Sequence, residues 1–467
     1  MKRKLLAVIA STFAFGIGAG EALAQSAGQA QEVGQQASTS QSADSDANAN
    51  QNAVNANVPV SIAGGTVTGG TSAANQSATN GANSAASNSS GTLQAAAANQ
   101  AGGGSSCTAG CGGSGQAQAI NQQAGTAQSA NSNANANQNA VNANVPVNVA
   151  GGDVNSGPSS ANQTATNGAS SNASNTSHTG QLALANQTGG GSSCKYGCGG
   201  SGQYQAIGQH AVTEQAASSN ANADQNAVNA NVPVNVAGGN INAGSSAANQ
   251  TATNGANSSA SNTAVTGQAS AASQTGGYSS CGSGCGGAGQ YQAIGQKALT
   301  LQSANSNANA NQNAVNANVP VNVAGGNITS GPSAANQTAT NGAASSATNN
   351  AATYQLAAAL QSAGCSTCKE EKKDPCKDSC HKDSCSYGCG GSGQAQKVVQ
   401  LAATLQWANS NATGNQNAVN DNSPVSTAGG NIASGPSAAN QTATNGAISS
   451  AYNAALTGQF ALALQSL

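Results

Sequence analysis

The chain is poor in charge and in aromatic side chains. Only 5% of its 467 residues are Asp, Glu, Lys or Arg, and only 2% are Phe, Trp or Tyr. So few basic residues argue against nucleic acid as a partner, because proteins that bind it carry a cationic patch. The scarcity of large apolar side chains makes an ordinary globular core hard to build. Two interpretations remain: a disordered chain, or a cross-β stack in which amide ladders and small side chains replace the core.

Long apolar runs are missing everywhere except near the N-terminus. A basic segment, Met1–Lys4, precedes the apolar segment Leu5–Gly20, and Ala22–Ala24 has the small-x-small pattern of a cleavage site. These features predict a secretory signal peptide over residues 1–24. No later run is long enough to cross a bilayer. We therefore expect a mature chain that starts at Gln25, does not span a membrane, and is secreted to the extracellular space or cell surface.

An internal repeat favours order over disorder. The block Asn50–Asn55 returns at intervals of 87, 87, 87 and 104 residues, and a disordered chain has no need for so strict a length. The predicted organisation is a low-complexity lead over 25–47, repeats over 48–134, 135–221, 222–308 and 309–412, and a truncated repeat over 413–467. The fourth repeat carries a 17-residue insertion rich in Cys, Lys and Asp near 365–384.

Regularly spaced glutamines subdivide each repeat, and their spacing returns from one repeat to the next. We expect them to form a structural ladder in which stacked side-chain amides hydrogen-bond along the axis, which satisfies both ends of each buried amide. A step of roughly two dozen residues fits one coil of a β-solenoid, and nineteen such coils would make a rod on the order of 90 Å long. The shorter step from Gln122 to Gln138 fits a half-coil or a loop. The predicted ladder residues are Gln51, Gln76, Gln100, Gln122, Gln138, Gln163, Gln187, Gln209, Gln225, Gln250, Gln274, Gln296, Gln312, Gln337, Gln361, Gln400, Gln416, Gln441 and Gln465.

The residues around each glutamine alternate with a period of two, which is typical of a strand. One predicted face reads Ala134, Ala136, Gln138, Ala140, Asn142, and the other reads Asn135, Asn137, Asn139, Val141. A short β-branched run, Val145–Val149, is interrupted by Pro146 and followed by the turn signal Gly151–Gly152. The predicted fold class is all-β, a repetitive β-solenoid or cross-β stack with Gln and Asn ladders, in which partial disorder stays open.

The repeat resembles curlin-type subunits of bacterial extracellular amyloid. The matching residues are Ala-x-Gln-x-Ala-x-Asn units such as Ala136–Asn142 and Ala161–Asn167, and they cover most of the mature chain. Asn148–Gly152 also looks like repeats of Pseudomonas-type amyloid fibre subunits, and Val145–Val149 is similar to a short motif in chaplins. The 87-residue superperiod and the cysteines depart from the curlin pattern. The resemblance implies a fibre with a role in biofilm cohesion, adhesion or a protective coat.

The twelve cysteines fall into four clusters. Oxidising conditions outside the cell make disulfides the first interpretation, either within a cluster or between adjacent repeats. The disulfide candidates are Cys107, Cys111, Cys194, Cys198, Cys281, Cys285, Cys385 and Cys389. The alternative is a zinc or copper site in the insertion, since thiolates and imidazole at short spacing suit these metals. Its candidate ligands are Cys365, Cys368, Cys376, Cys380, His381 and Cys385. We expect no other cofactor.

The sequence shows no carboxylate pair, phosphate-binding loop or nucleophile elbow, so we expect no enzyme. The leading hypothesis is a secreted structural protein that self-associates into amyloid-like fibres. A nucleator or an outer-membrane secretion component are its other candidate partners. Two alternatives stay open: a metal-binding or redox-active secreted protein that uses the cysteine clusters, and a disordered adhesin stalk.

Overall fold

The computed structural model describes residues 29–102, 105–111, 115–189, 192–198, 202–276, 279–281, 289–362, 366–368 and 393–466. Strands account for almost all of these residues, and there is no helix among them. The all-β prediction is therefore confirmed. The predicted signal peptide lies outside the described residues.

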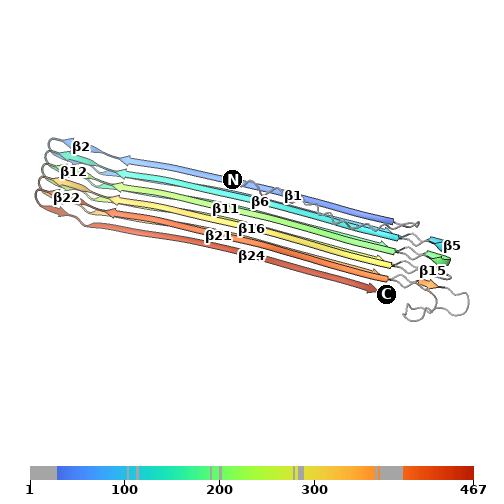
Figure 1. Cartoon of the computed structure of the whole chain (residues 1–467). Coiled ribbons are helices and arrows are strands. Elements are labelled where there is room, and N and C mark those ends of the chain that lie inside the picture. Colours follow the sequence, from blue (N-terminus) through green and yellow to red (C-terminus); the bar gives the residue numbers. More distant parts are fainter. Residues whose placement is uncertain are drawn as a thin grey trace.

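Ten long strands form two parallel sheets (Figure 1). Sheet 1 has the order β1-β6-β11-β16-β21 and sheet 2 the order β24-β19-β14-β9-β4. The strands of sheet 1 are β1 (Gln29–Asn57), β6 (Gly115–Asn144), β11 (Gly202–Asn231), β16 (Gly289–Asn318) and β21 (Gly393–Asn422). Those of sheet 2 are β4 (Ser72–Ala101), β9 (Ser159–Thr188), β14 (Ser246–Thr275), β19 (Ser333–Ser362) and β24 (Ser437–Ser466).

Short strands line the two ends of the long ones. At one end each chain reversal contains two of them: β2 (Val60–Ala63) and β3 (Val67–Gly69), β7 (Val147–Ala150) and β8 (Val154–Ser156), β12 (Val234–Ala237) and β13 (Ile241–Ala243), β17 (Val321–Ala324) and β18 (Ile328–Ser330), β22 (Val425–Ala428) and β23 (Ile432–Ser434). At the other end lie β5 (Ser105–Cys111), β10 (Ser192–Cys198), β15 (Ser279–Cys281) and β20 (Ser366–Cys368). Proline separates the long strand from the next short one, as expected at Pro146.

One rung is a complete circuit: out along sheet 1, through the reversal, and back along sheet 2 (Figure 1). Rung 1 comprises β1–β5, rung 2 β6–β10, rung 3 β11–β15, rung 4 β16–β20 and rung 5 β21–β24. The two sheets face each other with an offset of half a rung, because each sheet-2 strand packs between two sheet-1 strands. β4 contacts both β1 and β6, and β9 contacts both β6 and β11, whereas β24 packs against β21 alone.

Every rung stacks in register on the one before it. Gln51 pairs with Gln138, and the same offset persists through Cys368 before the insertion lengthens it from Gly393 onward. The expectation of one short coil for each glutamine step, and with it nineteen coils along a rod, is wrong. The chain has five rungs, which advance about 24 Å, while a 30-residue strand extends roughly 100 Å. The molecule is thus a slab, with its long axis along the strands.

The register follows from identity between rungs. At the 87-residue offset every inward-facing position of β11 meets the same residue in β6, and many outward-facing positions do so too, whereas the shorter steps repeat only the neighbourhood of the glutamine. Residues 29–47, predicted as part of a separate lead, lie in β1 and pair with residues 116–134. β24 supplies the second long strand of rung 5, which the sequence had assigned to a truncated repeat.

The space between the sheets is filled mainly by alanine and by amide and hydroxyl side chains. The predicted inner face is confirmed: Ala134, Ala136, Ala140 and Asn142 are fully buried. Larger apolar residues occur at only two levels, in the columns that contain Ile120 and Ile241. Small side chains let the two sheets approach closely, so the core depends on hydrogen bonds between amides as well as on apolar contact.

Glycine is required where one turn lies directly on the next. A Cβ at Gly238 would lie 2.4 Å from the carbonyl oxygen of Gly151, and a Cβ at Gly325 would lie 2.5 Å from that of Gly238. No real Cβ approaches a backbone oxygen so closely. The reversal can therefore stack at the strand spacing only if this column carries no side chain from Gly151 to Gly429.

We predict that Gly238→Ala destabilises the protein by about 1–3 kcal/mol, the usual cost of overpacking. Gly295→Ala is the control, because a Cβ there meets nothing closer than 4.0 Å and its column already holds Asn121 and Val399. Urea unfolding of both variants checks this. Equal midpoints would show that the turns can move apart without cost.

Candidate functional site

The nineteen predicted glutamines form four columns, two in each sheet, and do not follow one another in one ladder. The columns are Gln51/138/225/312/416 and Gln122/209/296/400 in sheet 1, and Gln76/163/250/337/441 and Gln100/187/274/361/465 in sheet 2. Gln35 extends the second column to rung 1. The step from Gln76 to Gln100 runs along one strand, and so does the step from Gln122 to Gln138. The steps that begin at Gln51 and at Gln100 cross from one sheet to the other.

Within a column each amide nitrogen donates to the amide oxygen of the preceding rung. Gln138 Nε2 donates to Gln51 Oε1 at 3.0 Å, and Gln225 Nε2 donates to Gln138 Oε1 at 2.8 Å. In several columns the second N–H crosses to the opposite sheet: Gln163 Nε2 donates to Gln76 Oε1 and to the Ala140 carbonyl, both at 2.8 Å. One glutamine link is missing, because Gln441 donates only to Ala418 and leaves Gln337 Oε1 without a partner among the described residues.

The sequence analysis predicted asparagine ladders as part of the fold class but named no asparagine among the ladder residues. Asn142 Nδ2 donates to Asn229 Oδ1 at 3.0 Å and to carbonyls of both flanking sheet-2 strands. Similar columns contain Asn144, Asn167 and Asn175. Further glutamine ladders contain Gln118, Gln128 and Gln181. The signal was present, since these residues recur every 87 positions and share the period-two face of the chosen glutamines.

The ladders have opposite directions. Glutamine amides donate toward rung 1, as Gln225 does to Gln138, whereas inner asparagine amides donate toward rung 5, as Asn142 does to Asn229. Each end of the stack consequently presents both donors and acceptors. The rung-1 end offers Gln51 Nε2 and Asn55 Oδ1, and the rung-5 end offers Gln416 Oε1 and Asn453 Nδ2.

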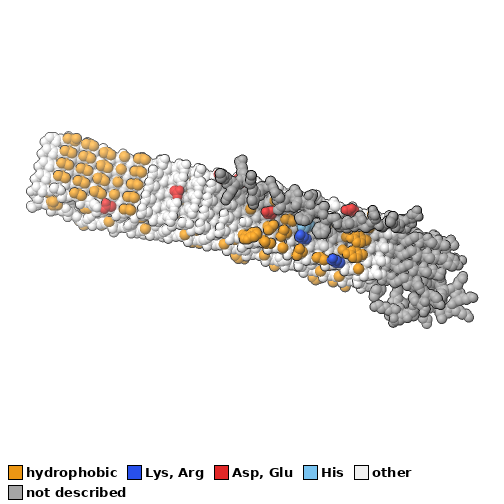
Figure 2. All heavy atoms as spheres, in the orientation of Figure 1, with side chains coloured by type: hydrophobic (Ala, Val, Ile, Leu, Met, Phe, Trp, Pro, Cys, Tyr) orange, Lys and Arg blue, Asp and Glu red, His pale blue; other side chains and the backbone are white. Residues whose placement is uncertain are grey.

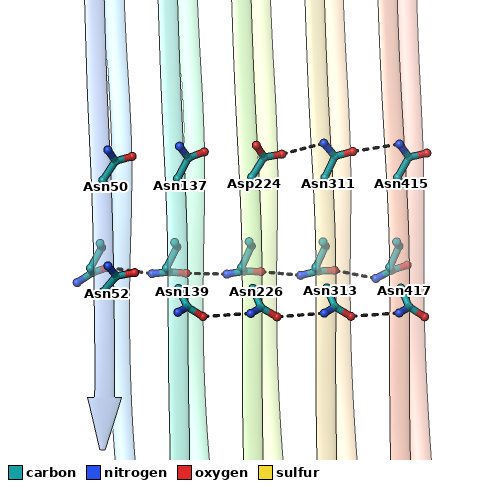
Figure 3. Close-up of a pocket in the computed structure, with 15 residues that line it drawn as sticks. Asn50, Asn52, Asn137, Asn139, Asp224, Asn226, Asn311, Asn313, Asn415 and Asn417 are labelled. Carbon is teal, nitrogen blue, oxygen red and sulfur yellow. Dashed lines mark hydrogen bonds between the residues drawn. The ribbon is translucent and has the colours of Figure 1, made fainter.

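Outward-facing asparagines form ladders too (Figure 3). Asn226 Nδ2 donates to Asn139 Oδ1, and Asn313 Nδ2 donates to Asn226 Oδ1, both at 3.1 Å. In the neighbouring column Asp224 accepts from Asn311 at 2.8 Å but, as a carboxylate, has no hydrogen to pass on. Tyr204 and Tyr291 stack at 5.3 Å between ring centroids with 5° between planes, another pairing of like with like.

Large apolar side chains that face outward are most numerous in rung 5. Trp407 is 57% exposed and Phe460 59% exposed, and the strands β21 and β24 that carry them also carry exposed leucines. Figure 2 shows ordered rows of apolar side chains at the reversal end, a band without them in the middle, and a second group toward the other end. The outer faces are therefore not uniform along the strands.

Charged side chains are sparse on the slab, and no column of the described strands gathers carboxylates. His210 stacks between Gln123 and Lys297. Burial lowers the pKa of His210, and the positive charge of Lys297 lowers it further. Across the described residues no group of three or more His, Cys, Asp or Glu side chains is placed to hold a metal ion.

The backbone brings cysteine positions from different rungs together. Cys107 pairs in register with Cys194, Cys194 with Cys281, and Cys281 with Cys368, while Cys111 pairs with Cys198. The residue aligned with Cys281 is thus Cys368 and not Cys385, and the extra residues of rung 4 enter after it. Cys285, Cys365, Cys376, Cys380, His381, Cys385 and Cys389 lie outside the described residues. The disulfide and metal hypotheses both stay predictions.

Comparison with known proteins adds no family. No protein-family model matches the chain, and no curated protein or solved structure matches it. The likeness to curlin-type subunits therefore rests on the repeat alone. In the part of the chain that the structure describes, no helix is long and apolar enough to cross a membrane.

We predict that Gln138→Leu is destabilising, because it leaves Gln51 Oε1 and Gln225 Nε2 without their amide partner inside the slab. An unsatisfied buried polar group costs about 1–3 kcal/mol. Asn139→Leu is the matched control: it is the next residue, faces outward, and interrupts an exposed ladder. Chemical unfolding of both variants checks the contrast. Equal losses of stability would mean that the inner ladders contribute no more than the outer ones.

Proposed function

We propose that this protein is a secreted structural protein that self-assembles into amyloid-like fibres outside the cell, with no enzymatic activity. The observation that carries the proposal is the pair of open edges at the two ends of the stack. β1 at one end and β24 at the other each present a row of about thirty residues whose outer backbone groups pair with no further strand among the described residues.

β1 carries Glu32, Asp44 and Asp46, but the β24 edge lacks the usual protection. Soluble β proteins block edge strands with charged residues, proline, bulges or a covering segment. β24 contains no charged residue and no proline along its whole length, and almost all of its described side chains are exposed. A long, flat, uncharged edge is a template for another strand. Self-association is therefore the natural fate of this slab.

The predicted signal peptide supports an extracellular location. The resemblance of the repeat to curlin-type subunits supports a role in a biofilm matrix, in adhesion or in a protective coat. The register of the cysteine positions supports a second feature of the assembly, which is a covalent or metal link between neighbouring rungs. Because Cys107, Cys194, Cys281 and Cys368 lie on adjacent strands, the cysteine end of the slab joins neighbouring rungs through one column of thiol-bearing positions. Inter-rung disulfides and the alternative of metal binding would both be located at this end of the slab.

Fibre diffraction of the purified mature chain tests the proposal. We expect a reflection near about 4.7–4.8 Å along the fibre axis, since strands would lie across it. Electron microscopy of producing cells, with and without the gene, should show surface fibres that depend on this chain. A mature chain that stays monomeric at all concentrations, or cells with unchanged surfaces, would contradict the proposal.

A further inference from the structure

The half-rung offset of the sheets leaves a gap at the rung-5 end. Throughout the slab a sheet-2 strand is flanked by the sheet-1 strands of its own rung and of the next one. Among the described strands of sheet 1, β24 has only β21 as a neighbour across the core. At the opposite end, β1 extends beyond β4 by the same half rung. The two ends therefore have complementary steps, and a second copy placed beyond rung 5 would bring its β1 into the missing position.

In each sheet-2 strand of rungs 1 to 4, three side-chain amides donate hydrogen bonds to the sheet-1 strand of the next rung. In rung 1, Asn80, Asn88 and Gln94 donate to main-chain carbonyls of rung 2, at 2.9, 2.6 and 2.8 Å. The equivalent amides of rungs 2, 3 and 4 each donate to the following rung in the same way.

In rung 5 the same amides are Asn445, Asn453 and Gln459, and no described strand lies beyond rung 5 to accept from them. By the established register, their acceptors would be the carbonyls of Asn50, Ser42 and Gln36 of a second copy. The column ends match as well, because Gln51 Nε2 of that copy would face Gln416 Oε1. Donor meets acceptor in both ladder directions only when rung 1 follows rung 5.

The charges at the two ends agree with this order. One outward-facing column reads Glu32, Ala119, Ala206, Ala293, Lys397, so its only charged residues are at the ends and have opposite sign. Stacking rung 1 of one copy on rung 5 of another would place that glutamate one strand spacing, about 4.8 Å, from the lysine.

No other charged column of the described strands conflicts with this arrangement. Asp44 and Asp46 would meet Asn409 and Asn411, and Asp421 would meet Ala56. Three bulky outward side chains of rung 5 would also meet small ones: Trp407 falls on Ser42, Leu405 on Ser40 and Val399 on Gly34.

Gly64, in rung 1, has no close neighbour among the described residues that would require a glycine. A Cβ at Gly151, Gly238, Gly325 or Gly429 would collide with the carbonyl of the preceding rung, at 2.4–2.5 Å. A Cβ at Gly64 would meet nothing within 4 Å, and the backbone there is not in the left-handed region. Glycine at position 64 becomes necessary only when a rung 5 lies before it, since Gly64 would then stand against the Gly429 carbonyl.

We propose that the protein polymerises head to tail, with rung 5 of one copy docked in register on rung 1 of the next, so that β21 pairs with β1 and β24 with β4. The inference rests on the proposed fibre function and adds its partner, polarity and register. Each copy adds five rungs, or about 24 Å, to a ribbon roughly 100 Å wide.

The first test compares Gly64→Ala with Gly34→Ala, two rung-1 glycines with open space around a new Cβ inside the chain. Both variants should keep the wild-type melting temperature. Seeded elongation by Gly64→Ala should be slower by roughly tenfold or more, because a backbone collision at the junction costs as much as core overpacking. Gly34→Ala should elongate as the wild type does, since its partner column already holds Val399.

The second test reverses the end charges. Lys397→Glu and Glu32→Lys should each slow elongation roughly two- to fivefold at low salt, and the double reversal should restore it. The two residues lie at opposite ends of the stack within one copy, so rescue cannot come from their pairing in the monomer. Wild-type elongation by Gly64→Ala and by both single reversals would overturn the head-to-tail junction while leaving the fibre proposal intact. Absence of any wild-type fibre would overturn both.

Discussion

The structure depends on one constraint: in a parallel, in-register stack, each side chain lies on the residue at the same position of the neighbouring rung. For an amide this is favourable, because the oxygen of one copy accepts from the nitrogen of the next and the chain of hydrogen bonds continues. For a carboxylate it is unfavourable, because two anions meet at the strand spacing and neither can donate. The near absence of charge and the abundance of Asn and Gln are two consequences of the same geometry.

The inner and outer faces respond to this constraint differently. Inside, an amide that loses its column partner is also cut off from water, and most inner positions are accordingly the same in every rung. Outside, water replaces a lost partner, and substitutions accumulate there, such as Asp224 among asparagines or Trp407 above Ser303. Positions that vary between rungs therefore face outward and invariant positions mostly face inward, in agreement with the alternating burial along each strand.

Much of the fold could be predicted from the sequence, but the length of the coil and the number of rungs could not. Period-two alternation assigned Ala134 and Gln138 to the buried face, and Pro146 marked the end of a long strand. The coil length was misjudged because an Ala-x-Gln neighbourhood that returns several times within each repeat resembles a small solenoid, whereas only the 87-residue offset matches the inward face along a whole strand. The half-rung offset of the sheets, which creates the complementary ends, could not be inferred, since it arises from interdigitation of side chains across the core and leaves no periodic signal.

The proportions of the slab connect folding to assembly. Its strands are roughly four times longer than its stack is tall, so the two end rungs make up a large part of the molecule. Ala308 of rung 4 is fully buried, yet the equivalent Ala412 of rung 5 is only partly so, and almost all described side chains of β24 are exposed. In a one-dimensional stack, stability is the sum of the rungs and the interfaces between them. A single copy has four such interfaces for five rungs, and under the proposed junction each added copy would supply a fifth, at which the amides of β24 would gain acceptors. The proposed head-to-tail assembly would therefore extend the same interaction that folds the chain, and it would leave exposed rungs only at the two ends of a fibre.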